Sequence, residues 1–411
     1  MSVPTHVAWI VPTAAAGGIG PVALETASAA AAIGCCDVTL IETHAAPADD
    51  RIEPGGLRRV ALDMDGTGAP ASVVLDWLDK HPQDVLFTSG VSHLNGIFPY
   101  VPNDTLHVAV QHDVGGRYRA DLLSYARYLD GVVSVSDYID GWMRKDLRAI
   151  GFSGLVRRIH NGTSYPPAPC RVASAGPLKL LFVGNLWLKG GAQLIDLAKA
   201  LRRRGVDFHL TVIGDDAAQP ERQFARAGMG ERLTWICRQR RDDLWRIYAS
   251  QDLLLMLSWG EPFGMVTIEA MGMGCVPVAY DVPSGSREII ENGISGFLLR
   301  SNPHEIAAVL ADLAPDRLLK MSAETARRAR AHFSAARAAR QYVELIDDLM
   351  CCKDLIRRSR LPADGHRLAV KPPRRSPLAR LYYGLPSSWR HRIRVGLAAY
   401  PTGTRWLRER F

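Results

Sequence analysis

Two acidic residues stand out in the segment Ser258–Val278 (SWGEPFGMVTIEAMGMGCVPV), where Glu261 and Glu269 are the only charged residues. The apolar run before them, residues 252–258, is typical of a strand that is covered on both faces of a parallel sheet. Glu261 is therefore expected in the loop at the carboxyl end of that strand, where doubly wound sheets bind their ligands. A tight turn is favoured there by Pro262 and Gly264, and a helix is predicted to begin near Val266.

This arrangement offers three different contacts to a ligand. The unpaired N–H groups and the positive dipole end of the predicted helix can bind a phosphate group. A carboxylate is a bidentate acceptor for vicinal hydroxyl groups, so Glu269 is suited to a ribose and Glu261 to a second sugar. Together these contacts predict a nucleotide sugar as the ligand. The alternative is that both glutamates are ordinary exposed acids beside a core helix.

A glycosidase pair is a further alternative for the two carboxylates. Retaining hydrolases place their carboxyl groups about 5 Å apart, and inverting hydrolases place them roughly 6.5–9.5 Å apart. Eight helical residues would separate the two backbones by about 12 Å. That spacing favours contacts with two ends of one long ligand over contacts on either side of one bond.

The segment EPFGMVTIEAMGMGCVPV (261–278) closely resembles the corresponding segment of glycosyltransferase family 4. Within it, residues 261–269 match the E-x7-E signature of retaining glycosyltransferases with the GT-B fold. The resemblance covers about residues 5 to 350 and includes, in order, GGIG (17–20), VVSVSDYI (132–139), IHNG (159–162), VGNLWLKGG (183–191), VIGDD (212–216) and SREIIENGISGFLL (286–299). It implies an α/β protein with two Rossmann-like, doubly wound domains that face a cleft. It also implies transfer of a sugar from a nucleoside diphosphate sugar, UDP- or GDP-linked, to a hydroxyl acceptor with retained configuration and with neither a metal ion nor a cofactor.

The resemblance implies a catalytic role for three residues. Glu261 would bind hydroxyl groups of the donor sugar, and Lys189 would neutralise the donor diphosphate in place of a metal ion. His112, in the sequence VQHD after a strand of the first domain, would lie near the donor and the acceptor. As an alternative, His112 is a hydrogen-bonded structural residue at the end of a core strand, and Lys189 is a plain lysine at a helix start.

The remaining implied contacts bind the donor. Glu269 would bind the ribose, and Gly18 would bring the backbone of the first domain close to the diphosphate. Near the donor sugar would lie the backbone amides of Phe263, Gly264 and Met265. At Asn185 the sequence departs from the family, which usually has an arginine there, in a loop that is one residue longer. Asparagine can donate a hydrogen bond but has no charge, so either Lys189 or a nearby arginine must bear the phosphate charge.

Neither glycine-rich loop matches a different nucleotide-binding motif. The loop Gly17-Gly18-Ile19-Gly20 follows a strand, but it lacks the G-x-G-x-x-G spacing of a dinucleotide-binding oxidoreductase. The loop that contains Lys189 lacks the G-x4-G-K-[ST] pattern of a Walker loop.

Two successive strings of strand–helix units must position these residues. Apolar runs lie at residues 6–12, 37–42, 84–90, 106–113 and 130–137, and then at 178–185, 208–216, 231–237, 252–258 and 276–281. Between the two strings the chain is rich in Pro, Ala and Ser, as linkers are. The prediction is an N-terminal acceptor-side domain at residues 1–163, a linker at 164–177, a C-terminal nucleotide-sugar-binding domain at 178–350 and a basic tail at 351–411. Residues 325–350 are predicted to be helical.

The composition is that of a soluble globular protein, with 47% hydrophobic and 22% charged residues. No apolar run approaches the roughly 18 residues that span a bilayer, and the N-terminus is typical of a buried first strand rather than a signal peptide. The seven cysteines have neither the spacing of a disulfide framework nor that of a zinc site. A cytoplasmic location without a metal site is therefore expected.

The positive charge is concentrated in the tail. From Cys351 to Phe411 there are fifteen Lys/Arg and three Asp/Glu, a net charge of +12, so the preceding 350 residues carry a net charge of −4. Clustered aromatic residues (LARLYYGLP, SSWRHRIRVGL) favour contact of residues 353–411 with anionic phospholipid on the inner face of the cytoplasmic membrane. A solvated extension or nucleic-acid binding is the alternative, and no nucleic acid is expected as a partner.

The tail and the family resemblance together predict a lipid-linked or cell-surface polysaccharide intermediate as the acceptor. A non-catalytic nucleotide-sugar-binding or scaffold protein of polysaccharide assembly is the alternative function, because Asn185 stands in place of the arginine.

Overall fold

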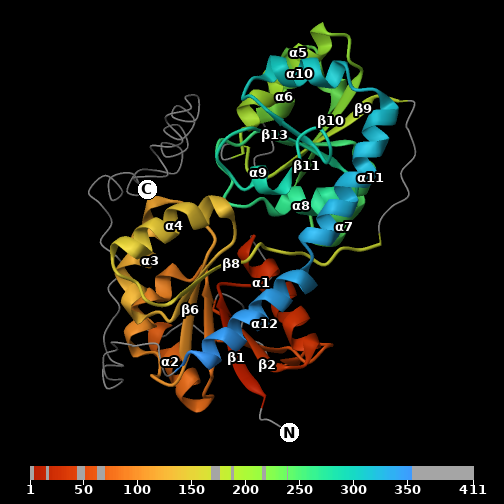
Figure 1. Ribbon diagram of the computed structural model, residues 1–411. Coiled ribbons are helices and arrows are strands. Elements are labelled where there is room, and N and C mark those ends of the chain that lie inside the picture. Colours follow the sequence, from red (N-terminus) through yellow and green to blue (C-terminus); the bar gives the residue numbers. More distant parts are fainter. Residues whose placement is uncertain are drawn as a thin grey trace. The chain divides into compact units, whose positions relative to one another are not determined.

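The computed structural model describes residues 4–14, 18–43, 51–62, 70–167, 176–186, 189–214, 219–237 and 239–353. By their internal contacts the described residues divide into two compact units (Figure 1). The first unit holds residues 4–164 and 335–353, and the second holds residues 165–334. Most of the predicted tail (354–411) and residues 168–175 of the predicted linker lie outside the described residues.

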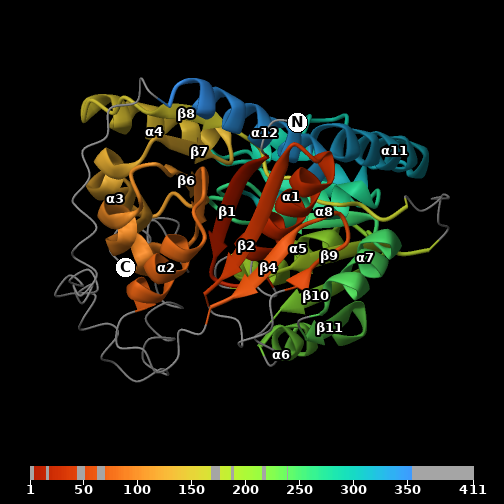
Figure 2. The same cartoon turned by 90° about the horizontal axis from the view of Figure 1, so that it is seen from below.

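The first unit is built on one sheet, with the described strands in the order β3-β4-β2-β1-β5-β6-β7-β8. Neighbouring strands are parallel except for the antiparallel pair β3–β4, and Figure 2 shows β4, β2 and β1 side by side. All five residues of β5 are buried, as expected for a strand that helices cover on both faces. The strands are β1 (Thr5–Val11), β2 (Cys36–Glu42), β3 (Arg51–Ile52), β4 (Arg58–Ala61), β5 (Val85–Ser89), β6 (Leu106–Gln111), β7 (Gly131–Ser134) and β8 (Leu155–Arg158).

The helices of the first unit begin and end where the local sequence allows. α1 is rich in alanine, the strongest helix former, and ends at Gly34, whose φ of 81° is the left-handed conformation of a helix C-cap. α4 begins after Ser136, whose side chain accepts a hydrogen bond from the N–H of Ile139. The α-helices are α1 (Ile19–Ile33), α2 (Pro70–Lys80), α3 (Gly116–Tyr125), α4 (Asp137–Ala149) and α12 (Ala335–Cys351), and the 3₁₀ helices are η1 (Ser92–Tyr100) and η2 (Ala126–Tyr128).

The segment predicted to be helical, residues 325–350, forms parts of two helices, α11 and α12, which are interrupted at Phe333 and Ser334. The ring of Phe333 is buried in the second unit, 5.9 Å from the ring of Phe263. The N–H of Ala335 donates instead to the carbonyl of Thr163 in the first unit, at 3.0 Å. The helix therefore stops where the chain passes from one unit to the other.

Helix α12 lies in the first unit, whereas the predicted C-terminal domain, residues 178–350, includes most of it. It packs against α1 (Figure 1), and the ring of Tyr342 lies 4.7 Å from Trp9 of β1 and 5.4 Å from Phe87 of β5. Tyr342 is buried, and burial raises the pKa of its hydroxyl. Helix α12 thus follows the second unit in the sequence but belongs to the first, because its apolar face packs onto the core of the N-terminal sheet.

The second unit has a parallel sheet, with the described strands in the order β11-β10-β9-β12-β13-β14. Its core includes Leu180 and Phe182 of β9, Leu255 of β12 and Leu201 of α5, all at most 1% exposed. The strands are β9 (Leu178–Val183), β10 (Phe208–Gly214), β11 (Leu233–Cys237), β12 (Leu253–Met256), β13 (Val276–Tyr280) and β14 (Phe297–Leu299).

The helices of the second unit lie between and after these strands. The α-helices are α5 (Leu194–Arg203), α6 (Gln219–Arg226), α7 (Arg241–Ser250), α8 (Met265–Gly272), α9 (Ser286–Ile289), α10 (Pro303–Ala311) and α11 (Pro315–His332), and the 3₁₀ helices are η3 (Gly191–Gln193) and η4 (Gly230–Arg232). Over the residues that the structure describes, no helix combines the length and the apolar character needed to cross a membrane.

Candidate functional site

Each sheet has one place where the strand order reverses direction. In the second unit the order reverses between β9 and β12, and in the first unit it reverses between β1 and β5. Loops at the carboxyl ends of such strand pairs diverge to opposite faces of the sheet and leave a crevice in which ligands bind. The predicted site residues lie at or close to these two places.

In the second unit the loops after β9 and β12 bring Lys189 and Glu261 together. The ammonium group of Lys189 donates to the carboxylate of Glu261, although 72 positions separate the two residues in the chain. The side chain of Glu261 is 11% exposed and that of Lys189 is 31% exposed. The pair is thus largely desolvated but keeps one open side, so a ligand can exchange with either partner.

Two glycines shape these loops. Gly190 follows Lys189 with a φ of 81°, and a Cβ atom there would lie 2.0 Å from the carbonyl oxygen of Leu257. Gly264 has a φ of 121° and is the residue from which α8 begins. Because only glycine adopts such angles without strain, Gly190 allows the lysine loop to touch the end of β12, and Gly264 allows the chain to turn directly into α8.

The N-terminus of α8 lies next to this ion pair in the chain. The helix begins at Met265, one residue before the predicted start at Val266. Thr267 and Ile268 donate their N–H groups to the carbonyl of Gly264 at 3.0 and 3.2 Å, whereas an N–H group at the very start of a helix, such as that of Met265, has no carbonyl of the helix within reach. Phe263 is buried, so its side chain anchors the loop. The carbonyl of Glu261 accepts the N–H of Gly285 at 2.8 Å, which fixes the loop on its other side.

Glu269 lies in the second turn of α8, and two side chains of α7 hold its carboxylate. The hydroxyl of Tyr248 donates to it at 3.1 Å and the guanidinium of Arg241 at 3.4 Å. Tyr248 is buried; burial and then the adjacent Glu269 carboxylate raise the pKa of the tyrosine. Arg241 also lies over the ring of Trp245, 5.5 Å from its centroid. A carboxylate held in this way is oriented and keeps lone pairs for a further hydrogen bond.

The helical estimate of about 12 Å for the separation of the two glutamates rests on a wrong premise. Only Glu269 lies in α8, whereas Glu261 lies in the loop before it. Asn185 lies half-buried at the end of β9, and its carbonyl accepts the N–H of Lys189 at 2.9 Å. Its backbone therefore helps to shape the lysine loop.

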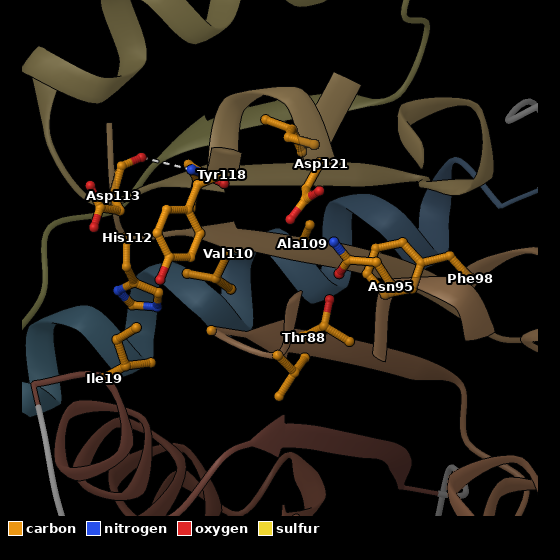
Figure 3. A pocket seen from close by; sticks show the side chains of 14 residues that line it. Ile19, Thr88, Asn95, Phe98, Ala109, Val110, His112, Asp113, Tyr118 and Asp121 are labelled. Atoms are coloured by element: carbon orange, nitrogen blue, oxygen red, sulfur yellow. Dashed lines mark hydrogen bonds between the residues drawn. The ribbon is translucent and has the colours of Figure 1, made fainter. Parts of the chain in front are cut away.

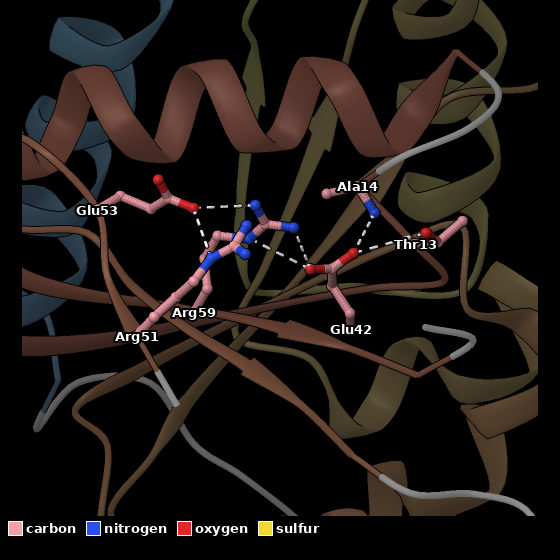
Figure 4. A network of polar contacts seen from close by, with 6 residues as sticks. All are labelled: Thr13, Ala14, Glu42, Arg51, Glu53 and Arg59. Carbon is pink, nitrogen blue, oxygen red and sulfur yellow. Dashed lines mark hydrogen bonds and ion pairs between the residues drawn. The ribbon is translucent and has the colours of Figure 1, made fainter. Parts of the chain in front are cut away.

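In the first unit Gly18 caps α1 in an open position. A Cβ atom there would meet nothing within 4 Å, so a ligand has room to approach the backbone. The start of this loop is tied to β2, since Glu42 accepts the N–H of Ala14 at 2.6 Å and pairs with Arg59 at 2.5 Å (Figure 4). Glu42 is buried, and Arg59 extends the network to Glu53 at 3.0 Å. Glu42 thus ties the loop before α1 to the neighbouring strands.

His112 follows β6 and lines a pocket of about 210 Å³ (Figure 3). Burial lowers the pKa of its imidazole from 6.5 to about 4, so the ring is uncharged at neutral pH. The buried Nε2 atom has no hydrogen-bond partner among the described residues. This ring nitrogen can therefore take a hydroxyl group of a ligand as its partner.

The rest of the pocket wall comes from β5, η1, β6, α3 and the first residue of α1. The lining residues are Ile19, Thr88, Gly90, Val91, Asn95, Phe98, Ala109, Val110, Gln111, His112, Asp113, Tyr118, Asp121 and Leu122. Asp113 has a structural task, since its carboxylate accepts the N–H groups of Val114 at 2.6 Å and Gly115 at 3.0 Å before α3 begins.

The predicted site residues thus fall into two groups. One group lies around β9, β12 and α8 of the second unit, and its members are Asn185, Lys189, Glu261, Phe263, Gly264, Met265 and Glu269. The other group, Gly18 and His112, lies in the first unit, where Ile19 beside Gly18 shares a pocket with His112.

Sequence reasoning missed the side chains that complete each group. Arg241 and Tyr248 contact Glu269 from 28 and 21 positions away in the chain. Tyr118 and Asp121, both in helix α3, line the pocket of His112. An arginine and a buried tyrosine on an otherwise ordinary helix give no local signal of the acid that they will meet.

Comparison with known proteins finds a family likeness within the second unit. Residues 172–332 match the family described as "Glycosyl transferases group 1". The D-inositol 3-phosphate glycosyltransferase of Mycobacterium sp. (strain KMS) is 30% identical over 172 residues, which are 41% of this chain and 36% of that protein. The chain thus spans about a third of the length of this and two further mycobacterial relatives of the same name.

Solved structures show a likeness over most of the chain. Sucrose-phosphate synthase from Thermosynechococcus elongatus superposes with a TM-score of 0.69 at 19% identity, over 85% of this chain and 100% of that chain. HepE of Anabaena, in complex with UDP and glucose, superposes with a TM-score of 0.63 at 18% identity, over 84% of this chain and 100% of that chain. Together with the two parallel sheets, these likenesses confirm the predicted GT-B class of fold.

Proposed function

We propose that the whole protein is a retaining, metal-independent glycosyltransferase. The match of residues 172–332 to the family described as "Glycosyl transferases group 1" supports this proposal. It moves a sugar from a UDP- or GDP-linked donor to a hydroxyl acceptor. The observation that carries the proposal is the ion pair of Lys189 and Glu261 at the point where the strand order of the second sheet reverses.

The pair offers the donor two complementary contacts. Lys189 turns from Glu261 to the diphosphate when the donor binds, and the carboxylate that it leaves accepts hydroxyl groups of the donor sugar. The N–H groups at the start of α8, from Gly264 and Met265, add positive charge to the same site. Glu269, oriented by Arg241 and Tyr248, accepts the ribose hydroxyls.

In the reaction the bond between the anomeric carbon and the diphosphate oxygen breaks, and the nucleoside diphosphate departs with the electron pair. The acceptor oxygen forms its bond on the same face of the sugar, and its hydroxyl proton passes to the departing diphosphate. Lys189 and the start of α8 stabilise the negative charge that develops on the leaving group, the kind of electrostatic contribution that is often the largest in catalysis. With this positive charge supplied by the protein, the proposal requires neither a divalent metal ion nor a cofactor.

The acceptor belongs to the same proposal. His112 and its pocket in the first unit bind the acceptor, which is a lipid-linked or cell-surface polysaccharide intermediate. The basic tail, with its clustered aromatic residues, supports a peripheral position of the protein on the inner face of the cytoplasmic membrane.

Asn185 favours a second candidate, a protein that binds a nucleotide sugar in polysaccharide assembly without turning it over. In this chain the place of the family's arginine has no charge, so stabilisation of the leaving group would depend on Lys189 and α8. The two candidates differ in one property, which is turnover of the donor.

A screen of UDP- and GDP-sugars by thermal shift and by donor hydrolysis, in EDTA, tests the proposal. One donor is expected to raise the melting temperature of the wild type and to be hydrolysed slowly. Lys189→Ala and Glu261→Ala should lose both effects, while Lys199→Ala, an exposed lysine of α5, should keep them. A donor that stabilises the protein without turnover, even with acceptor glycans present, would support the non-catalytic candidate instead.

A further inference from the structure

The charge of the pocket beside His112 limits what can enter it. Two of its fourteen lining residues, Asp113 and Asp121, are acidic, and none of the fourteen is a lysine or an arginine. His112 is uncharged at neutral pH because burial lowers its pKa to about 4. The lining therefore contributes negative charge and no positive charge.

Helix N-termini are the other common source of positive potential. Among the described residues three helices begin at the pocket wall: α1, α3 and the 3₁₀ helix η1, whose hydrogen-bond geometry is poorer than that of an α-helix. The N–H groups just before α3 are already bound, because the Asp113 carboxylate accepts those of Val114 and Gly115. The start of α1, at Ile19, follows Gly18, which the family resemblance places near the donor diphosphate. A phosphate group in the pocket would thus lie close to two aspartates, and like charges repel strongly in a partly desolvated site.

The shape and polarity of the pocket suit a hydroxylated ring. In Figure 3 the side chains of Thr88, Asn95 and Asp121 gather on one side, and His112 and the hydroxyl end of Tyr118 lie on the other. Val110 lies between the two sides, and Ala109 lies beside Asp121. Polar edges and an apolar floor match a sugar or cyclitol ring, whose hydroxyl groups point outward and whose C–H groups cover its faces.

We propose that this pocket binds an uncharged, hydroxylated ring of the acceptor and rejects a ring that carries a phosphate group. The substrate class is a neutral sugar or cyclitol end. The inference rests on the proposed function, because that function makes the pocket an acceptor site. It separates this protein from an enzyme whose acceptor is a sugar or cyclitol phosphate.

Saturation-transfer NMR on the full-length protein tests the inference with paired probes. The pairs are glucose with glucose 6-phosphate and myo-inositol with inositol monophosphate. At least one neutral member is expected to bind the wild type ten-fold or more tightly than its phosphate. Asp121→Lys should reduce this preference at least ten-fold or reverse it, because the substitution replaces a negative charge on the pocket wall by a positive one.

Two further variants make the result specific to the pocket. Asp104→Asn removes a negative charge from an exposed position of the same unit and should leave the preference unchanged. Tyr118, which is 38% exposed, can be truncated to alanine at little cost to folding, and Tyr118→Ala should weaken the neutral probes. This second variant decides the location of binding even if Asp121→Lys fails to fold.

Three results would overturn the inference: no neutral probe binds, a phosphate binds the wild type as tightly as its neutral partner, or Tyr118→Ala changes nothing. The readout needs no donor turnover, so the two proposals can fail separately. Selective binding of neutral rings without donor hydrolysis would contradict the proposed function alone. Normal donor hydrolysis with equal binding of phosphorylated probes would contradict this inference alone.

Discussion

The two units share an architecture and differ in how they use charge. Each has a parallel sheet whose strand order reverses once, and each has candidate residues at the loops of that reversal. In the second unit, charged side chains meet in pairs at the site, Lys189 with Glu261 and Arg241 with Glu269. In the first unit, the pocket residue His112 is uncharged and Asp113 accepts backbone N–H groups. Elsewhere in that unit Glu42 accepts the N–H of Ala14 and pairs with Arg59.

This difference indicates two uses of polar groups. A charged side chain in a partly exposed ion pair can leave its partner and bind a ligand of opposite charge, because the ligand replaces the lost interaction. A carboxylate that accepts backbone N–H groups is instead part of the fold, since its removal leaves those donors unsatisfied. We therefore expect substitutions at the paired residues to change ligand binding and turnover, and substitutions in the first unit to change stability or selectivity.

The largest effect is expected from Lys189→Ala, which removes the ammonium group that pairs with Glu261. Under the proposed function, donor turnover should fall about 100- to 1,000-fold, the usual loss when one group that stabilises developing negative charge is removed. Turnover by the wild type and by the variant is measured in EDTA, with Lys199→Ala as the matched control on α5. A residual rate within three-fold of the wild type would assign Lys189 to the structure of the loop.

Substitution of Gly190 tests whether the reversal in the second sheet depends on close backbone approach. Gly190→Ala should reduce the free energy of unfolding by about 2–4 kcal/mol, because the new Cβ atom collides with the carbonyl of Leu257 and the backbone is left-handed. Gly205 has a similar φ of 71° but open space around a Cβ atom, so Gly205→Ala should cost only about 1 kcal/mol. Denaturant unfolding of both variants measures the difference, and equal costs would show that φ alone matters.

Glu269→Gln tests the second ion pair. The amide keeps the shape of the side chain but weakens the hydrogen bonds to a ribose, so the dissociation constant of the nucleotide should rise about 10- to 100-fold, as for the loss of a charge-assisted hydrogen bond. Titration calorimetry with UDP and GDP gives the constant. Glu231→Gln, at an exposed position of the same unit, is the control, and an equal effect of both substitutions would remove Glu269 from the nucleotide site.

The smallest effect concerns pH and the first unit. Burial lowers the pKa of His112 from 6.5 to about 4, so the unfolded chain binds more protons than the folded chain between these two values. The stability of the wild type should therefore fall as the pH decreases from 6.5 to 4, by about 1–3 kcal/mol for this group. His112→Gln should lose this share of the pH dependence, which unfolding curves across the range will show. Parallel curves for the two proteins would mean that the imidazole titrates normally.

Much of the fold could be read from the chain because its signals are local. Buried parallel strands are continuous apolar runs, and runs such as 252–258 and 276–281 coincide with β12 and β13. The loop with Glu261, the glycine before α8 and the start of the helix lie within five residues, so turn chemistry alone places them. Phe263, Gly264 and Met265 are consecutive residues of this same turn.

Other features depend on contacts between distant parts of the chain. The sequence alone determined the two strings of strand–helix units and the acidic loop, since propensity and hydrophobic pattern act over a few residues. Only the tertiary structure decided that Lys189 meets Glu261, that Tyr248 and Arg241 orient Glu269, and that α12 completes the first unit. It alone also assembled the pocket of His112, because that wall requires β5, η1, β6 and α3 to pack around one cavity. Which side chains meet in this way is set by the packing of whole elements, and no short stretch of sequence carries that information.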